Sequence, residues 1–128
     1  MIEPGRVESA QETVTEDMTA EAMGSGDVPV LSTPSIVASV ERLAVASLAD
    51  ALPPGTTTVG ARVELDHLAP TPVGALVSVT VRLEAVEGRR LTFGFEASDP
   101  AGTVARGSHV RVAVEREAFL DTARGRAG

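Results

Sequence analysis

Apolar and polar residues alternate along four stretches in the second half of the chain, as they do in β-strands with one buried face. Segments rich in proline, glycine and acidic residues separate these stretches. Short turns of this kind join antiparallel neighbours, so the pattern predicts a sheet. The predicted strands cover residues 59–69, 75–85, 91–98 and 104–115, and a weaker alternation over residues 6–15 adds a first strand at the sheet edge.

A different period marks the segment before these four strands. From Ser32 onward, apolar residues recur at spacings of three and four, which places them on one face of a helix. Ser32 or Thr33 can cap this helix, and Pro34 fits its first turn, where a missing N–H has no cost. The prolines and glycine at positions 53–55 stop it. We therefore predict a helix that runs from this cap to about Leu52, with one face buried.

The order of these elements predicts an α+β fold. One strand, one long helix and four strands joined by short turns are typical of an antiparallel sheet with the helix on one face. A length of 128 residues and a hydrophobic content of 43% suit a single domain spanning residues 1–128. The ends, including segment 121–128 with its arginine, alanine and glycine, are expected to be frayed.

Composition argues against several classes of function. A net charge of −7 disfavours nucleic acid as a partner, because binding to phosphates requires clustered cations. Without cysteine there is no disulfide or thiolate, and two separated histidines give no metal-ligand spacing. No apolar run is long enough for a secretion signal or a membrane span. We therefore expect a cytoplasmic protein that uses neither a metal nor a cofactor.

Three polar residues stand out against the apolar pattern. The alternation places His67 on the same inward face as Val63 and Leu65. Glu41 lies on the margin of the apolar helix face, and Thr33 lies at the helix start, where N–H groups favour developing negative charge. A structural histidine, a solvated glutamate and a helix cap are the ordinary interpretations. Together, however, a hydroxyl, a carboxylate and an imidazole are groups that catalyse acyl transfer.

The sequence resembles the fluoroacetyl-CoA thioesterase group of the hotdog superfamily, from about Val30 to the last predicted strand. The resemblance is carried by Ser32-Thr33-Pro34 with Glu41, by residues 66–74 (DHLAPTPVG), by residues 86–91 (VEGRRL) and by residues 107–111 (GSHVR). It implies a hotdog fold, in which an antiparallel sheet of about five strands wraps around one long central helix.

The resemblance also implies an active site. In that group a threonine, a glutamate eight residues later and a histidine 26 residues beyond it form the catalytic group, and Thr33, Glu41 and His67 reproduce both spacings. Gly60 matches a glycine whose backbone holds water or the thioester carbonyl, and Arg111 is a candidate contact for coenzyme A phosphates. The implied activity is hydrolysis of an acyl-CoA thioester by a homodimer with active sites at the subunit interface.

One departure from the group bears on the substrate. The fluoroacetyl enzyme closes its pocket with phenylalanines just before the helix, whereas residues 24–31 contain no aromatic side chain. A more open pocket favours a larger acyl group, or a thioester on a carrier protein. A covalent anhydride on Glu41, an acyl ester on Thr33 and direct attack by water are the open mechanisms. A non-catalytic acyl-thioester binding module and an enoyl-thioester hydratase or dehydratase are the alternative functions.

Overall fold

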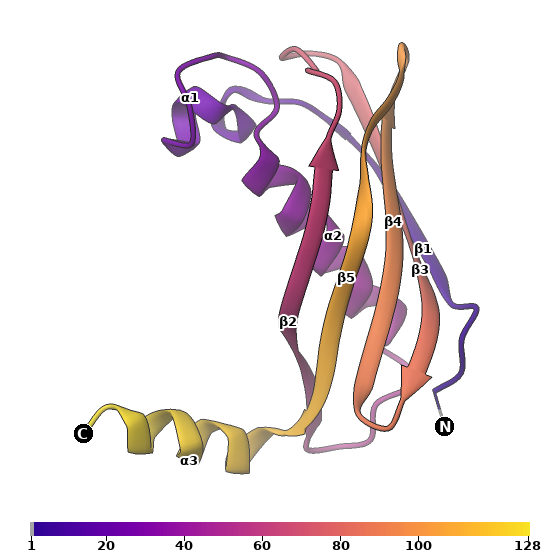
Figure 1. Ribbon diagram of the computed structural model, residues 1–128, viewed down its shortest axis with the longest axis vertical. Helices are drawn as coiled ribbons and strands as arrows, with labels where there is room; N and C mark the ends of the chain where they lie inside the picture. The colour runs from indigo at the N-terminus through magenta and orange to yellow at the C-terminus, as the bar shows by residue number, and fades with distance from the viewer. Residues whose placement is uncertain (1) are drawn as a thin grey trace.

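The computed structural model describes residues 2–128 and centres on one five-stranded antiparallel sheet (Figure 1). The strands are β1 Val7–Thr13, β2 Thr56–His67, β3 Leu76–Glu87, β4 Arg90–Asp99 and β5 Gly102–Glu115. The helical elements are η1 Glu16–Met18, α1 Ala20–Met23, α2 Thr33–Ser47 and α3 Arg116–Arg126. The order across the sheet is β1-β3-β4-β5-β2. The predicted α+β arrangement, with the first strand at an edge, is confirmed.

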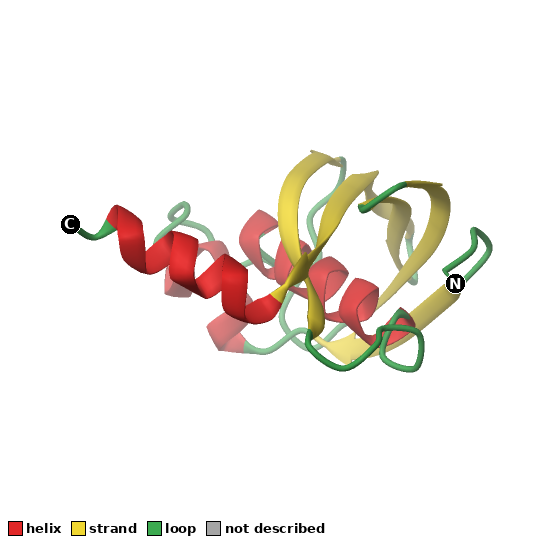
Figure 2. Ribbon diagram, turned by 90° about the horizontal axis from the view of Figure 1, so that it is seen from below, coloured by secondary structure: helices red, strands yellow, loops and turns green. Residues whose placement is uncertain are grey.

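Helix α2 lies at the centre of the core. The sheet curves around it, as Figure 2 shows from below. Ser32 caps α2 by accepting a hydrogen bond from the N–H of Ser35, and Pro34 occupies the first turn. The buried face of the helix packs on the inward side chains of β3 and β4, which alternate as predicted. The largest fully buried apolar residues are Phe93, Leu31, Ile36, Leu48, Leu83 and Leu91.

Helix α2 is shorter than the sequence predicts. It ends at Ser47 instead of near Leu52. Nη1 of Arg6 donates to the carbonyl oxygen of Ser47 at 3.0 Å, so this carbonyl has a partner outside the helix. The chain then tightens, and the N–H of Leu48 bonds to the carbonyl of Val45, three residues back. A contact from the segment that leads into β1 therefore accompanies the end of the helix, well before the prolines.

Strand β2 forms the second edge of the sheet and contains an irregularity. Gly60 pairs with Arg111, but the next paired residue, Arg62, lies opposite Val110. One extra residue of β2 is therefore inserted between two successive residues of β5, which is a β-bulge. Such an insertion reverses the alternation of inward and outward side chains along the strand.

The bulge corrects the predicted faces of β2. The alternation placed Val59 on the same face as His67, and this is wrong because the inserted residue reverses the parity between them. Thr58 and Gly60 share the inward face with His67 instead. The Cα of Gly60 faces the Glu41 side chain on α2, and His67 contacts the start of the same helix.

After β5 the chain continues as helix α3, which covers Arg116–Arg126. Glu115 caps α3 by accepting a hydrogen bond from the N–H of Ala118. Arg124 pairs with Asp121 one turn earlier. Every residue of α3 is exposed, so local bonds of this kind hold the helix without burial. None of the helices described between residues 2 and 128 combines the length and the apolar character needed to cross a membrane.

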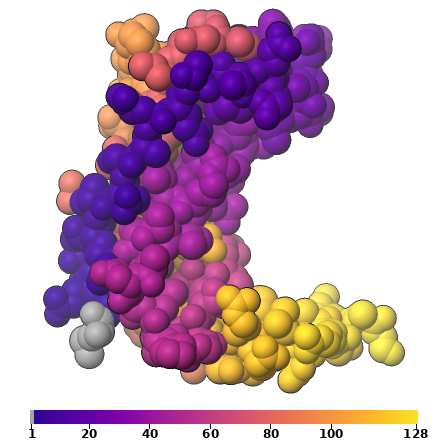
Figure 3. Space-filling view, turned by 180° about the vertical axis from the view of Figure 1, so that it is seen from behind, coloured from indigo at the N-terminus to yellow at the C-terminus, as the bar shows by residue number. Residues whose placement is uncertain are grey.

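The free edge of β2 borders a recess in the surface. Helix α3 and the η1–α1 segment both project on this side of the sheet, at opposite ends of β2 (Figure 1). Seen from behind, they enclose a hollow between them (Figure 3). This hollow exposes the edge of the sheet and one side of α2.

Candidate active site

A hydrogen bond joins the first residue of α2 to the last residue of β2. Oγ1 of Thr33 lies 2.8 Å from Nδ1 of His67. Ser32 supplies the helix cap, so the Thr33 hydroxyl is available for this contact. The other ring nitrogen of His67, Nε2, is buried, and no polar group of the described residues bonds to it. An imidazole nitrogen without such a partner is chemically able to accept or donate a proton.

The Thr33–His67 pair lines a pocket that the segment between α1 and α2 closes on one side. The residues contributed by α1 and this segment are Ala20, Ser25, Gly26, Asp27, Val28, Val30, Leu31 and Ser32. Among the described residues that line the pocket, none is aromatic apart from the imidazole itself. The wall next to the pair is thus built from short side chains.

Glu41 lies about two turns further along α2 and faces the bulge of β2. Its side chain is 43% exposed, in agreement with the predicted position on the margin of the apolar face. Gly60 leaves room for the carboxylate, because a Cβ atom at position 60 would lie 2.5 Å from Oε2 of Glu41. A larger residue at position 60 would displace the Glu41 carboxylate.

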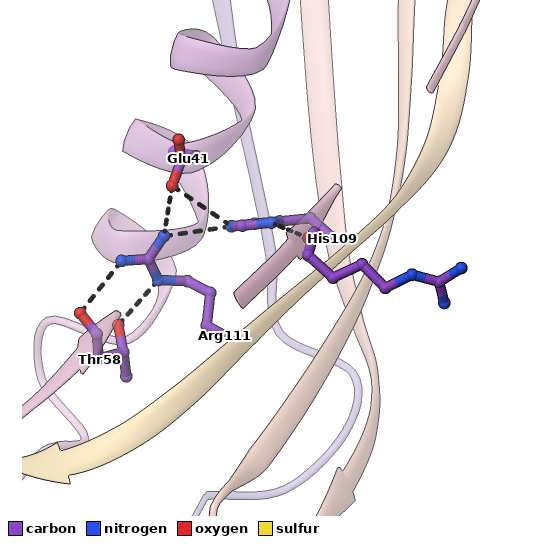
Figure 4. A network of polar contacts seen from close by, with 5 residues as sticks. Glu41, Thr58, His109 and Arg111 are labelled. Carbon is purple, nitrogen blue, oxygen red and sulfur yellow. Dashed lines mark hydrogen bonds and ion pairs between the residues drawn. The ribbon is translucent and has the colours of Figure 1, made fainter. Parts of the chain in front are cut away.

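Arg111 on β5 holds this carboxylate from the protein interior (Figure 4). Its Nη1 donates to Oε2 of Glu41 at 3.1 Å. Its Nε donates to Oγ1 of Thr58 at 2.9 Å, and its Nη2 donates to the carbonyl oxygen of Thr58 at 3.1 Å. The Arg111 side chain is only 7% exposed. Its guanidinium is therefore turned toward the carboxylate and β2 and away from solvent.

His109 completes the network from two residues earlier on β5. Its Nδ1 lies 2.8 Å from the carbonyl oxygen of Arg62, and its Nε2 lies 3.1 Å from Nη1 of Arg111. The ring is fully buried and stacks on Phe93 at a centroid distance of 6.3 Å. Burial lowers the pKa of His109 and the charge of Arg111 lowers it further, while the Arg62 carbonyl and Glu41 act in the opposite direction.

The predicted site residues form two groups within one chain. Thr33 and His67 contact each other, whereas Glu41 contacts Arg111 and faces Gly60. Eight residues separate Thr33 from Glu41, which corresponds to a rise of about 12 Å along a helix. Within residues 2–128, no hydrogen bond or ion pair connects the two groups.

Sequence reasoning missed the contacts that hold Glu41. Thr58 could not be assigned because the bulge decides which face of β2 it occupies. A signal for the other two residues was present. His109 and Arg111 are two positions apart on one strand, so they share a face and can both reach the helix.

Comparison with known proteins identifies the family. Residues 14–117 match the family described as "FlK: Fluoroacetyl-CoA-specific thioesterase". The chain is 36% identical to a fluoroacetyl-CoA thioesterase of Streptantibioticus cattleyicolor over 90 residues, which make up 70% of this chain. The match spans 65% of the length of that relative.

Solved structures agree with this result. The fluoroacetyl-CoA thioesterase FlK superposes with a TM-score of 0.90 at 27% identity, covering 98% of this chain and 97% of the other. A hot-dog-like protein from Thermanaerovibrio acidaminovorans gives 0.91 at 31% identity, with 98% and 93% covered. A thioesterase superfamily member from Thermus thermophilus gives 0.87 at 28% identity, with 98% and 96% covered. These superpositions confirm the predicted hotdog fold. The chain therefore belongs to the fluoroacetyl-CoA-specific thioesterase family.

Proposed function

We propose that this protein hydrolyses a small to medium acyl thioester of coenzyme A, or of an acyl-carrier protein, to the free acid and the thiol. Family membership supports the reaction class. One observation supports the site: the Thr33 hydroxyl lies 2.8 Å from an imidazole whose other nitrogen is buried and has no partner within the described residues. A hydroxyl and an imidazole in this arrangement can stabilise an oxyanion and move a proton.

The proposed reaction consumes one water molecule for each thioester. In one route Glu41 removes a proton from water, and the water oxygen bonds to the thioester carbonyl carbon. In the other, Glu41 itself bonds to that carbon, and water later hydrolyses the resulting anhydride. Thr33, at the positive end of the α2 dipole, stabilises the carbonyl oxygen as it becomes negative. The C–S bond then breaks, and His67 gives the thiolate a proton that originates from the water. The products are one carboxylic acid and one thiol.

Turnover in isotopically labelled water separates the possible routes. Label recovered in the carboxylate of Glu41 establishes an anhydride at that residue. An acyl group trapped on Thr33 by acid quenching establishes an acyl-threonine. Label confined to the product acid, with no anhydride on Glu41 and no acyl ester on Thr33 trapped by rapid quenching during turnover, indicates direct attack by water.

The proposed active unit is a homodimer with its sites at the subunit interface. Strand β2 is 12 residues long and has a free edge, and two such edges can pair about a two-fold axis. Val63 on β2 is 36% exposed, and Val45, one turn after Glu41 on α2, is 49% exposed. Pairing of this kind sets the two α2 helices antiparallel, so that each Glu41 approaches the Thr33–His67 pair of the other subunit. This arrangement would reconcile the two separate groups with a single catalytic site.

The short side chains beside the Thr33–His67 pair affect the size of the acyl group that the pocket can accept. The pocket wall formed by residues 24–31 carries no aromatic side chain that could close over a two-carbon acyl group. We therefore expect activity to rise from fluoroacetyl and acetyl esters to longer or branched ones. The same open pocket would also admit an acyl thioester on a carrier protein.

An enoyl-CoA ester tests the proposed reaction against hydration. This substrate reports both outcomes at once, because hydrolysis releases a free thiol whereas water addition removes the enoyl absorbance and leaves the thioester intact. We expect thiol release at the rate of substrate loss. Loss of the enoyl absorbance without free thiol would contradict hydrolysis, and saturable binding without either signal would indicate a binding module.

A further inference from the structure

The side chain of Arg111 has to be oriented before it can hold Glu41. Nη1 of Arg111 donates at 3.1 Å to Oε2 of Glu41 and, also at 3.1 Å, meets Nε2 of His109. A guanidinium carries only donors. The contact with His109 is therefore a hydrogen bond only if Nε2 of the imidazole has no proton.

The partner of the other ring nitrogen completes the assignment of the ring protons. Nδ1 of His109 lies 2.8 Å from the carbonyl oxygen of Arg62, and a carbonyl oxygen can only accept. Nδ1 must therefore carry the proton. With Arg111 donating to Nε2, the two partners together fix one protonation state, a neutral imidazole protonated at Nδ1. This assignment follows from the chemistry of the partners alone.

We propose that His109 is a positioning residue of the hydrolytic site, which through its unprotonated Nε2 holds Arg111 against the carboxylate of Glu41. The inference rests on the proposed function of Glu41. A proton on Nε2 would remove the acceptor and place a second cation beside Arg111. Nη1 would then lose one of the two bonds that direct it, and the guanidinium would be held only by Thr58 and by Glu41 itself.

The β-bulge of β2 and the groups packed around the His109 ring set its hydrogen bonds. Arg62 is the first paired residue after the β-bulge of β2, and its carbonyl sets the tautomer of His109. The charged groups that face the ring are Arg111 on β5 and Glu41 on α2, whose carboxylate oxygen lies 4.0 Å from Nε2. From β4 the ring meets the uncharged Phe93. The bulge is thereby linked to the orientation of the carboxylate.

Two substitutions at position 109 separate positioning from packing. His109→Leu removes both hydrogen bonds and fills the buried position with an apolar side chain, whereas His109→Gln supplies an oxygen that can accept from Arg111. Phe93→Leu is the matched control, because it removes the ring stacked on His109 and leaves the hydrogen bonds. We expect His109→Leu to lower kcat at least about tenfold with KM changed less than about threefold. His109→Gln should restore most of kcat, and Phe93→Leu should keep it at a temperature where the variant is folded.

Three results would overturn the inference. They are a folded His109→Leu variant with the kcat of the wild type, a Gln variant no better than the Leu variant, and a Phe93→Leu variant that loses as much kcat as His109→Leu. Each would show that His109 acts through packing or not at all.

Nitrogen NMR of the His109 ring tests the same inference without turnover. The chemical shifts of the two ring nitrogens distinguish a protonated nitrogen from an unprotonated one, and we expect a protonated Nδ1 and an unprotonated Nε2 from about pH 8 to about pH 7. A protonated Nε2 in this range would contradict the positioning role even if thioesters are hydrolysed. Absence of hydrolysis by a wild-type protein that shows the expected ring would instead contradict the proposed function.

Discussion

Nδ1 of His67 lies 2.8 Å from Oγ1 of Thr33, although the two residues are 34 positions apart in the chain. Two local features make this contact possible. Ser32 takes the helix cap and leaves the Thr33 hydroxyl available, and the bulge after Gly60 lets His67 share the face of β2 on which Gly60 meets α2. The cap and the bulge lie on different elements, so substitutions can test them independently.

Thr33→Ala should lower kcat/KM at least about tenfold, equivalent to about 1.4 kcal/mol, because the hydroxyl proposed to stabilise the oxyanion is lost. Its effect on unfolding should be small, since the cap belongs to Ser32. Ser32→Ala is the control and should show the opposite result, a loss of about 1 kcal/mol in unfolding free energy with activity kept. Urea unfolding and thiol release measure the two effects. Equal activity in Thr33→Ala and the wild type would contradict the assigned role.

Gly60→Ala should lower kcat without unfolding the protein. The new Cβ would lie 2.5 Å from Oε2 of Glu41, so the carboxylate must move away from its present position beside Arg111. Gly125→Ala is a suitable control, because a Cβ there meets no atom within 4 Å and alanine favours the helix by up to about 1 kcal/mol. Steady-state kinetics of both variants check the prediction. A Gly60→Ala variant with unchanged kcat would show that the position of the carboxylate does not matter.

The stability of the protein should depend on pH through His109. Burial lowers the pKa of this group in the folded state below its usual value of 6.5, so the unfolded state binds more protons in the window just below that value. The unfolding free energy should therefore fall as pH falls through this window, by at most about 1.4 kcal/mol per pH unit, and this contribution should be absent above it. Urea unfolding of the wild type and of His109→Leu at several pH values isolates the effect. Parallel pH dependences in the two proteins would refute it.

Mixing two inactive variants should restore activity if the site is shared between subunits. Glu41→Ala and His67→Ala should each be inactive alone. In a mixed dimer, one site receives an intact Glu41 from one subunit and an intact His67 from the other, so random exchange should recover about a quarter of wild-type activity. Co-unfolding and refolding of the two variants, followed by a thiol-release assay, provides the measurement. A mixture no more active than its components would place the three residues within one chain.

The sequence predicted the centre of the sheet because burial there follows simple alternation. Val77, Val79, Val81 and Leu83 face the core as the period of two requires. The same reasoning gave the wrong faces for the start of β2, since a single inserted residue after Gly60 leaves no mark in the hydrophobic pattern. A bulge depends on the strand opposite, and one strand read alone does not contain that information.

Contacts between distant residues account for the other differences. The carbonyl of Ser47 bonds to Arg6, 41 positions away, at the point where α2 ends before the predicted Leu52. The Arg111–Glu41 bond spans 70 positions, so the spacing along α2 and β2 could not predict it. Thr33 and His67 were predicted only from family spacing and from the inward position of the histidine. Their contact also requires Ser32 to take the cap, which the sequence left open between Ser32 and Thr33.

The most direct test of thioester hydrolysis at this site is thiol release from a panel of acyl-CoA esters, from fluoroacetyl to aromatic, by the wild type and by His67→Ala. Circular dichroism would establish that both proteins are folded. The account predicts turnover of at least one ester by the wild type, with a preference for acyl groups larger than fluoroacetyl, and loss of that turnover in the variant. Absence of thiol release from every ester, or equal turnover by His67→Ala, would contradict it.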